Sequence, residues 1–159
     1  MDSQKKINKI YDRYLDNLKR NGATSASFAL FSANKLVLYS CSDKKWEDFY
    51  NNSDEAKHCH IRNHGIVMQK NKINSFSIIW DNLKPNNDES KFLNEQRMKN
   101  NRCHGVTIAQ TLDDDKLLCV ILTGENSNDQ FASQVLSQKS KLIEETSNII
   151  TLCPLIVTL

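Results

Sequence analysis

Four residues with metal-binding side chains lie within one short stretch of the chain. They are His58, Cys59, His60 and His64, and the last two are four residues apart, so a helix would place them on one face. Zinc accepts nitrogen and sulfur ligands of this kind but needs three or four of them. The pair of histidines has no acidic residue in the metalloprotease pattern, and no C-x2-C accompanies it. We interpret the stretch as a polar helix with titrating histidines and predict no metal site.

The other nucleophiles and acids form no pattern typical of catalysis. The chain contains no G-x-S-x-G, P-loop or G-x-G-x-x-G sequence, and its four glycines leave little scope for a phosphate-binding loop. The five cysteines are widely spaced, which favours free thiols in a reducing compartment over disulfides. We therefore expect a cytoplasmic protein that is not an enzyme and carries no cofactor.

Two tryptophans and one tyrosine are the residues best suited to hold a small molecule. Trp46 and Tyr50 are four residues apart, so a helix would turn both rings to the same side, and Trp80 follows further along the chain. Such rings often belong simply to the hydrophobic core. A buried indole N–H or phenol O–H also needs a hydrogen-bond partner, and a ligand oxygen is one such partner. Both interpretations stay open at this point.

The spacing of apolar residues predicts helices at both ends of the chain and strands between them. Steps of three and four indicate a helix, and alternation indicates a strand. The expected strands are residues 24–32, 35–41, 74–82, 104–111 and 116–123. The expected helices are residues 3–20, a short helix capped by Ser42 and ending near Asn51, residues 53–65, residues 88–101 with Phe92, Leu93 and Met98 on the apolar side, and residues 127–151.

This order of elements predicts an α/β (α+β) fold. Helices at both ends of the chain, around antiparallel hairpins, indicate a three-layer α-β-α sandwich with a central antiparallel sheet, like the PAS and GAF folds. Folds of this type commonly hold a small molecule between sheet and helices. The length of 159 residues is typical of one domain.

The order of these features resembles the autoinducer-binding domain of LuxR-type quorum-sensing transcription regulators. In that family a W-x3-Y pair, a later Trp and a G-[IV]-T-[IVL]-P strand line a pocket for an acyl-homoserine lactone. Here Trp46 and Tyr50, then Trp80, then the Gly-Val-Thr-Ile run at 105–108 stand in the same order. The resemblance covers the chain from about the first helix to the last. It implies that the Trp46 indole donates to the polar head of a ligand and that Ile121 faces its acyl chain.

The chain departs from the family pattern where the family binds the polar head of its ligand. The resemblance places Cys59 where the family has an Asp that accepts the ligand's amide N–H, and a thiol is a poor acceptor. Ser42 stands where many members have a Tyr, and Ala109 replaces the Pro of the strand motif. The resemblance therefore implies a pocket for an acyl-homoserine lactone, an analogue or another apolar signal. Its expected ligand-binding residues are Ser42, Trp46, Tyr50, Cys59, Trp80 and Ile121.

Two expectations about function follow. The first is that residues 1–152 form the autoinducer-binding-like sensory domain of a LuxR-like regulator, with residues 153–159 as a tail or the start of a linker. The second is a stand-alone interaction or dimerisation module of the same fold with a degenerate pocket. A homodimer is compatible with both. Basic residues are spread along the chain with acidic residues among them, and no segment has the ~18 apolar residues that span a bilayer. We therefore expect neither DNA contact from this domain nor a membrane partner.

Overall fold

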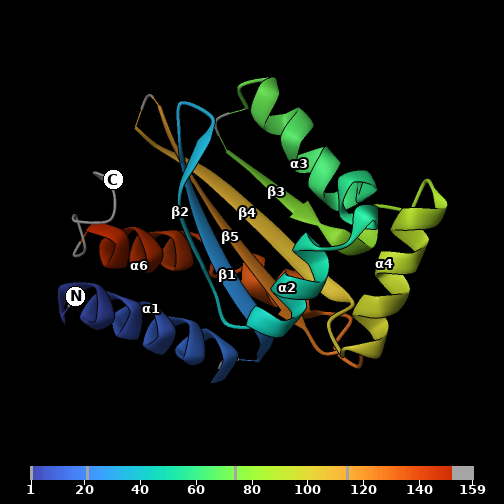
Figure 1. The fold of residues 1–159 in the computed structure, drawn as a ribbon, viewed down its shortest axis with the longest axis horizontal. Coiled ribbons are helices and arrows are strands. Elements are labelled where there is room, and N and C mark those ends of the chain that lie inside the picture. The colour runs from blue at the N-terminus through green and yellow to red at the C-terminus, as the bar shows by residue number, and fades with distance from the viewer. Residues whose placement is uncertain (1, 21, 74, 114, 152–159) are drawn as a thin grey trace.

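A computed structural model of the chain describes residues 2–20, 22–73, 75–113 and 115–151. These residues form a five-stranded antiparallel sheet with helices on both faces, and the strand order is β2-β1-β5-β4-β3 (Figure 1). The predicted α-β-α sandwich with a central antiparallel sheet is therefore confirmed. The tail expected at residues 153–159 lies outside the described residues.

The elements follow the predicted order, with differences at their ends. The strands are β1 (Ala23–Ser32), β2 (Lys35–Cys41), β3 (Ser75–Ile79), β4 (His104–Asp113) and β5 (Lys116–Gly124). The helices are α1 (Asp2–Arg20), α2 (Lys44–Asn51), α3 (His60–Lys70), α4 (Asp88–Lys99), α5 (Phe131–Leu136) and α6 (Lys139–Thr151), with 3-10 turns η1 (Asp54–His58) and η2 (Trp80–Asn82). Ala33 and Asn34 join β1 to β2 with φ of 48° and 65°, the positive values that a two-residue hairpin turn needs to match the strand twist.

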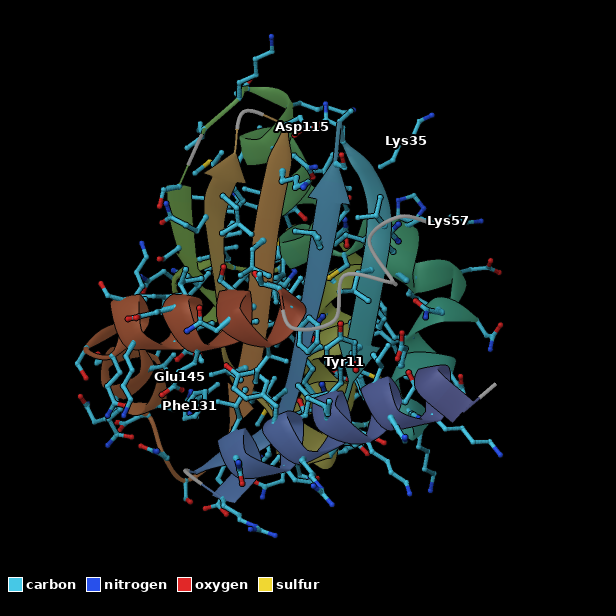
Figure 2. All side chains as sticks on the ribbon, turned by 90° about the vertical axis from the view of Figure 1, so that its left-hand side faces the viewer. Tyr11, Lys35, Lys57, Asp115, Phe131 and Glu145 are labelled. Atoms are coloured by element: carbon cyan, nitrogen blue, oxygen red, sulfur yellow. The ribbon has the colours of Figure 1, made fainter. Side chains whose placement is uncertain are left out.

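One face of the sheet is covered by α1, α5 and α6. Figure 2 looks onto this face and shows α1 and α6 crossing the strands. Leu15 of α1 and Phe28 of β1 are almost completely buried there, and the Tyr11 ring meets Phe28 edge-on at 5.1 Å between centroids. The Tyr14 hydroxyl is 2.6 Å from Thr146 Oγ1, which ties α1 to α6. This face forms the larger of the two hydrophobic cores.

The opposite face of the sheet carries α2, η1, α3 and α4, and it has a separate core. Alternate residues of a strand point to opposite faces, so β4 sends Val106 and Ile108 into the first core and Ala109 into the second. The second core consists of Cys59, Ile61, Phe76, Ile78, Trp80, Leu93 and Ala109, with Tyr50, Met68, Leu83, Leu117, Cys119 and Ile121 packed against it. Most of the aromatic residues singled out from the sequence lie in this layer.

Two predicted helices are each divided in the structure. The helix expected at 127–151 is interrupted between α5 and α6, where the Ser137 hydroxyl donates to the Gln134 carbonyl at 2.7 Å. Hydrogen bonds of this kind compete with the backbone ladder of a helix. The helix expected at 53–65 is instead η1 followed by α3, because the extended backbone of Cys59 (φ −62°, ψ 117°) separates them. The second helix then continues through Gly65 to Lys70.

The apolar side expected for α4 is wrong for two of its three residues. Leu93 is completely buried, but Phe92 and Met98 are 37% and 58% exposed. The buried face of α4 instead carries Ser90, Leu93 and Arg97. An arginine can occupy such a face because its methylene stem is apolar and its guanidinium can stack on an aromatic ring.

Candidate functional site

Five of the six predicted ligand-binding residues lie on the sheet face that carries α2, α3 and α4. Tyr50, Cys59, Trp80 and Ile121 belong to the second core or pack against it. The Trp46 ring stacks on Tyr50, with 6.4 Å between centroids and 25° between planes. Residues that are distant in the sequence therefore converge on one face of the sheet.

The sixth predicted residue, Ser42, lies at the end of β2 and contacts the neighbouring strand. Its hydroxyl accepts a hydrogen bond from the Ala26 amide at 2.9 Å. The prediction that it caps the following helix is wrong, because Asp43 does so: Asp43 Oδ1 accepts from the Trp46 amide at 3.0 Å. A carboxylate at this position satisfies an amide that the helix itself leaves unpaired. Because the capped amide is that of Trp46 itself, the cap also holds the Trp46 backbone in place.

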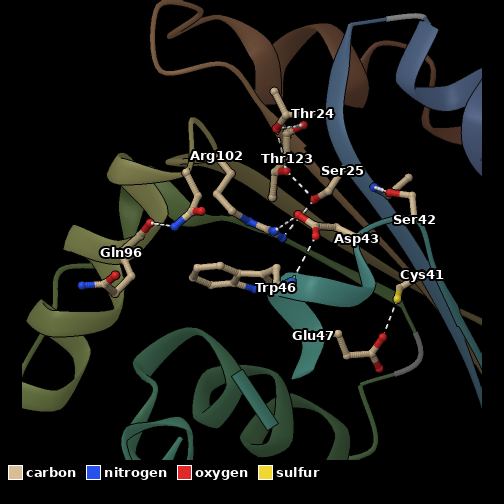
Figure 3. Close-up of polar contacts among 12 residues, drawn as sticks. Thr24, Ser25, Cys41, Ser42, Asp43, Trp46, Glu47, Gln96, Arg102 and Thr123 are labelled. Atoms are coloured by element: carbon tan, nitrogen blue, oxygen red, sulfur yellow. Dashed lines mark hydrogen bonds and ion pairs between the residues drawn. The ribbon is translucent and has the colours of Figure 1, made fainter. Parts of the chain in front are cut away.

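Arg102 lies against Trp46 and was not anticipated from the sequence. Its guanidinium carbon is 4.3 Å from the centroid of the Trp46 ring. Nη1 donates to Asp43 Oδ2 and Nη2 to the Ser25 hydroxyl, each at 2.9 Å (Figure 3). Burial lowers the pKa of Arg102 to about 10, although the Asp43 charge opposes this change, so the side chain stays protonated at neutral pH. Arg102 thus joins the start of α2 to β1 through charge and stacking.

Trp80 is held by residues of the Gly-Val-Thr-Ile run. Its ring lies directly against Gly105, where any Cβ would overlap the ring atoms. Its indole Nε1 donates to Thr107 Oγ1 at 3.0 Å. Gly105 and Thr107 are two apart, so both point to the Trp80 side of β4. On the neighbouring strand, Ile121 pairs with Thr107. The Gly-x-Thr spacing is thus explained within this chain: the glycine leaves room for the Trp80 ring, and the threonine accepts its N–H.

A buried polar cluster links Tyr50 to Trp80 through Cys59 and Arg97. Cys59 has no exposed surface, and Arg97 Nη2 donates to its Sγ at 3.3 Å. The Tyr50 hydroxyl also bonds to this sulfur. Burial by itself raises the pKa of the Cys59 thiol, but the Arg97 charge and the Tyr50 bond more than offset it, and the pKa lies below its ordinary value. The Arg97 guanidinium completes the connection by lying 5.2 Å from the Trp80 ring centroid.

The histidines predicted to share a helix face both belong to α3, four residues apart, but their surroundings differ. His60 is buried and its Nε2 lies 3.2 Å from the Leu83 carbonyl oxygen, whereas His64 is exposed. Burial lowers the pKa of His60, and the charge of Arg97 lowers it further. Its Nδ1 is buried without a hydrogen-bond partner among the described residues. Across the described part of the chain, no three His, Cys, Asp or Glu residues are grouped so that they could hold a metal ion.

The described cysteines other than Cys59 show no activating environment. Cys41, Cys59, Cys103 and Cys119 are all free thiols. Burial raises the pKa of Cys41 and of Cys119 to about 12 in each case, and the Glu47 carboxylate bonded to Cys41 adds to its rise. Cys59 is therefore distinguished from these two thiols by its positively charged partner, Arg97.

Two surface hollows of the described chain lie away from these aromatic residues. One of about 440 Å³ opens between α1, β2 and α2, and another of about 320 Å³ opens between β4 and α6. Between the sheet and α4, Cys59 and Leu93 have no exposed surface and Trp80 is 9% exposed.

Arg97 could have been found from the sequence, but Arg102 could not. Arg97 follows Leu93 by four residues and Ser90 by seven, so helical spacing places all three on one face. Arg102 lies in the loop after α4, where no periodic pattern applies. Its partners Asp43 and Ser25 are 59 and 77 residues away in the sequence. Only the tertiary fold brings these three residues together.

Comparison with known proteins gives a likeness in structure alone. No family model matches the chain, and no curated protein sequence is similar to it. The fold is similar to the crystal structure of SdiA from Escherichia coli, with a TM-score of 0.60 and 14% sequence identity. The match covers 93% of this chain and 62% of the SdiA chain, so this chain spans about three fifths of SdiA. At 14% identity, this likeness is evidence for the fold alone. None of the described helices is both long and apolar enough to cross a membrane.

Proposed function

We propose that the chain senses a small, largely apolar molecule bound between the sheet and α2, η1, α3 and α4, as the sensory domain of a LuxR-like transcription regulator. The fold likeness to SdiA, a LuxR-type acyl-homoserine-lactone receptor, supports this proposal. The observation that carries it is the convergence of Trp46, Tyr50 and Trp80 on one sheet face. The Trp46 indole N–H makes no hydrogen bond with any described residue, so it is free to donate to a ligand, while the N–H of Trp80 is occupied by Thr107.

Burial of the ligand's apolar part would provide most of the affinity. Phe76, Ile78 and Ile121 provide apolar surface on the sheet side of this layer. Apolar area removed from water contributes about 25 cal/mol per Å². A ligand that binds only the folded chain stabilises it and shifts any signalling or assembly equilibrium coupled to that state.

The test is a thermal-shift and native mass-spectrometry screen of the purified chain against acyl-homoserine lactones, fatty acids and a lipid extract. A binder present at 100 times its Kd should raise the free energy of unfolding by about 2.7 kcal/mol, and Tm by roughly 5 to 10 °C. The Trp46→Phe variant keeps a ring but lacks the N–H, so the same binder should have lower affinity for it. A screen in which no compound binds or raises Tm would remove support for a sensing function.

A second candidate function is a protein-interaction or dimerisation module that needs no ligand. The observation that favours it is the position of Arg97 and Arg102, which stack on Trp80 and Trp46 within the layer where a ligand would lie. The exposed surfaces of α1 or α6 would then provide the contact. Size-exclusion chromatography with light scattering, followed by pull-down, distinguishes the two functions. A strict monomer without a partner contradicts the interaction function.

A further inference from the structure

Among the described residues, two buried arginines face the aromatic residues of the site, and one carboxylate, Asp43, pairs with them. Arg97 and Arg102 are 4% and 7% exposed. They are close enough for the charge of Arg97 to lower the pKa of Arg102, after the larger effect of burial. Asp43 pairs with Arg102 at 2.9 Å. The two buried guanidiniums of the described chain thus outnumber their carboxylate partners by one.

Arg97 is the guanidinium without a carboxylate partner among the described residues. Nη1 donates to the amide oxygen of Asn94 at 2.9 Å, and Nη2 donates to Cys59 Sγ. Trp80 offers the face of its ring. An amide, a sulfur and a ring are weak substitutes for the water that a buried cation has lost. A guanidinium can instead bind a carboxylate through two parallel hydrogen bonds, which are among the strongest in proteins.

A further polar group near Arg97 can donate to an anionic head group. The Tyr50 hydroxyl lies beside the same Cys59 sulfur that Arg97 contacts. His60 does not contribute, because its Nε2 donates to the Leu83 carbonyl and the neutral ring leaves Nδ1 as an acceptor. The apolar side chains of the second core adjoin these groups. The combination suits a molecule with a carboxylate at one end and an aliphatic chain at the other.

We infer that the ligand of the proposed sensory site is a carboxylate with an aliphatic chain, such as a free fatty acid, and that Arg97 binds its carboxylate. This inference rests on the proposed sensing function and specifies the ligand class. A neutral lactone of the same chain length fills the same apolar volume but brings no charge to Arg97. The preference for the acid over its neutral analogues therefore distinguishes this inference from sensing in general.

The experiment measures the binding of three probes with one chain length by titration calorimetry: decanoate, methyl decanoate and N-decanoyl-homoserine lactone, below their aggregation concentrations. We expect decanoate to bind the unmodified chain about tenfold or more tightly than either neutral probe. The variant Arg97→Gln should lose that preference and Arg97→Lys should keep part of it. The control Lys99→Gln removes an exposed charge from the same helix and should bind all three probes as before.

Each contrary outcome has a defined meaning. Equal or tighter binding of the lactone or the ester overturns the carboxylate inference and leaves the sensing function standing. Binding of decanoate by Cys59→Ser but not by the unmodified chain also overturns it, because the Cys59 thiolate would then be the partner of Arg97. No binding of any probe overturns the inference, and the wider ligand screen then decides the sensing function. The comparison of acid with ester uses the unmodified chain and so does not depend on the folding of any variant.

Discussion

At the scale of single residues, the contact between Gly105 and Trp80 shows how a short motif positions the site. The indole can lie against β4 only because Gly105 has no side chain, and its N–H reaches Thr107 two residues further on. Val106 between them is completely buried on the other face of the sheet. Of these three consecutive residues, Gly105 and Thr107 position Trp80 and Val106 packs in the other core.

The variant Gly105→Ala should destabilise the chain by about 1 to 3 kcal/mol, because its Cβ forces the Trp80 ring out of position. Denaturant unfolding followed by tryptophan fluorescence measures both the loss and the displaced ring. Gly65→Ala is a suitable control. Its Cβ would meet only Ile78 Cδ1 at 3.7 Å, and alanine favours the helix there by up to about 1 kcal/mol. Equal effects of the two substitutions would contradict the proposed contact.

His104 should give the stability of the chain a pH dependence above about 6.5. Burial lowers its pKa, but the hydrogen bond from Nδ1 to Asp81 at 2.9 Å and the Asp81 charge more than offset burial, so the net pKa is raised. The stabilising contribution is complete below the unfolded pKa and is lost as pH rises through the folded pKa. His60, whose pKa is lowered, acts in the opposite direction and below 6.5.

The measurement is the free energy of unfolding of the chain and of Asp81→Asn between pH 6 and 9. The unmodified chain should lose stability as the pH rises above about 6.5. The variant lacks the carboxylate that raises the pKa of His104, so its profile should be flatter. Identical slopes for both proteins would show that the ion pair has no part in stability.

At the scale of elements, α2 depends on one carboxylate for two separate interactions. Asp43 Oδ1 caps the helix at the Trp46 amide, and Oδ2 pairs with Arg102. The helix has no fully buried residue of its own. Short helices are marginally stable in water without packing or capping. The position of the Trp46 ring is therefore set from the N-terminal end of α2.

The substitutions Asp43→Ala and Asp43→Ser separate these two interactions. Alanine removes both the cap and the ion pair and should cost about 2 to 4 kcal/mol, since it leaves the buried Arg102 charge unpaired. Serine can still cap α2, so its cost should be smaller by about 1 kcal/mol. Thermal and denaturant unfolding give these values, and equal costs would mean that the cap contributes nothing.

At the scale of the whole molecule, the sheet separates two helical layers with different roles. The layer of α1, α5 and α6 packs mainly through apolar side chains, whereas the layer of α2, α3 and α4 contains the buried arginines, thiol and histidine. The two cores share the same strands, so both contribute to the stability of one folded unit. The affinity of a ligand bound in the layer of α2, α3 and α4 should therefore depend directly on the packing of that layer and not on the packing of the other.

Truncation of one buried leucine in each layer tests this division. Leu15→Ala and Leu93→Ala remove side chains that are 1% and 0% exposed, and each should destabilise the chain by about 2 to 5 kcal/mol. At a temperature where both variants are folded, only Leu93→Ala should change the affinity for a binder found in the screen. A similar loss of affinity in Leu15→Ala would place the site elsewhere.

The sequence by itself determined the strands, the terminal helix α1 and the antiparallel sandwich. These features depend on local sequence patterns: short runs of apolar and small residues in β1 and β5, and apolar steps of three and four in α1. The sequence also singled out Trp46, Tyr50 and Trp80, by the four-residue spacing of the first two and by their order along the chain. Their assembly on one face follows from the order of the strands.

Only the tertiary structure decided which charged residues are buried among those rings. Arg102 reads as a surface residue because arginine is usually exposed, and only the helical spacing from Ser90 and Leu93 indicates that Arg97 is not. Their burial depends on Asp43, Ser25, Cys59 and the two indoles, which come from distant segments. The breaks at Cys59 and Ser137 also depend on backbone geometry that apolar spacing does not encode. Local pattern thus specifies the elements, whereas the partners of a buried charge are specified by packing between them.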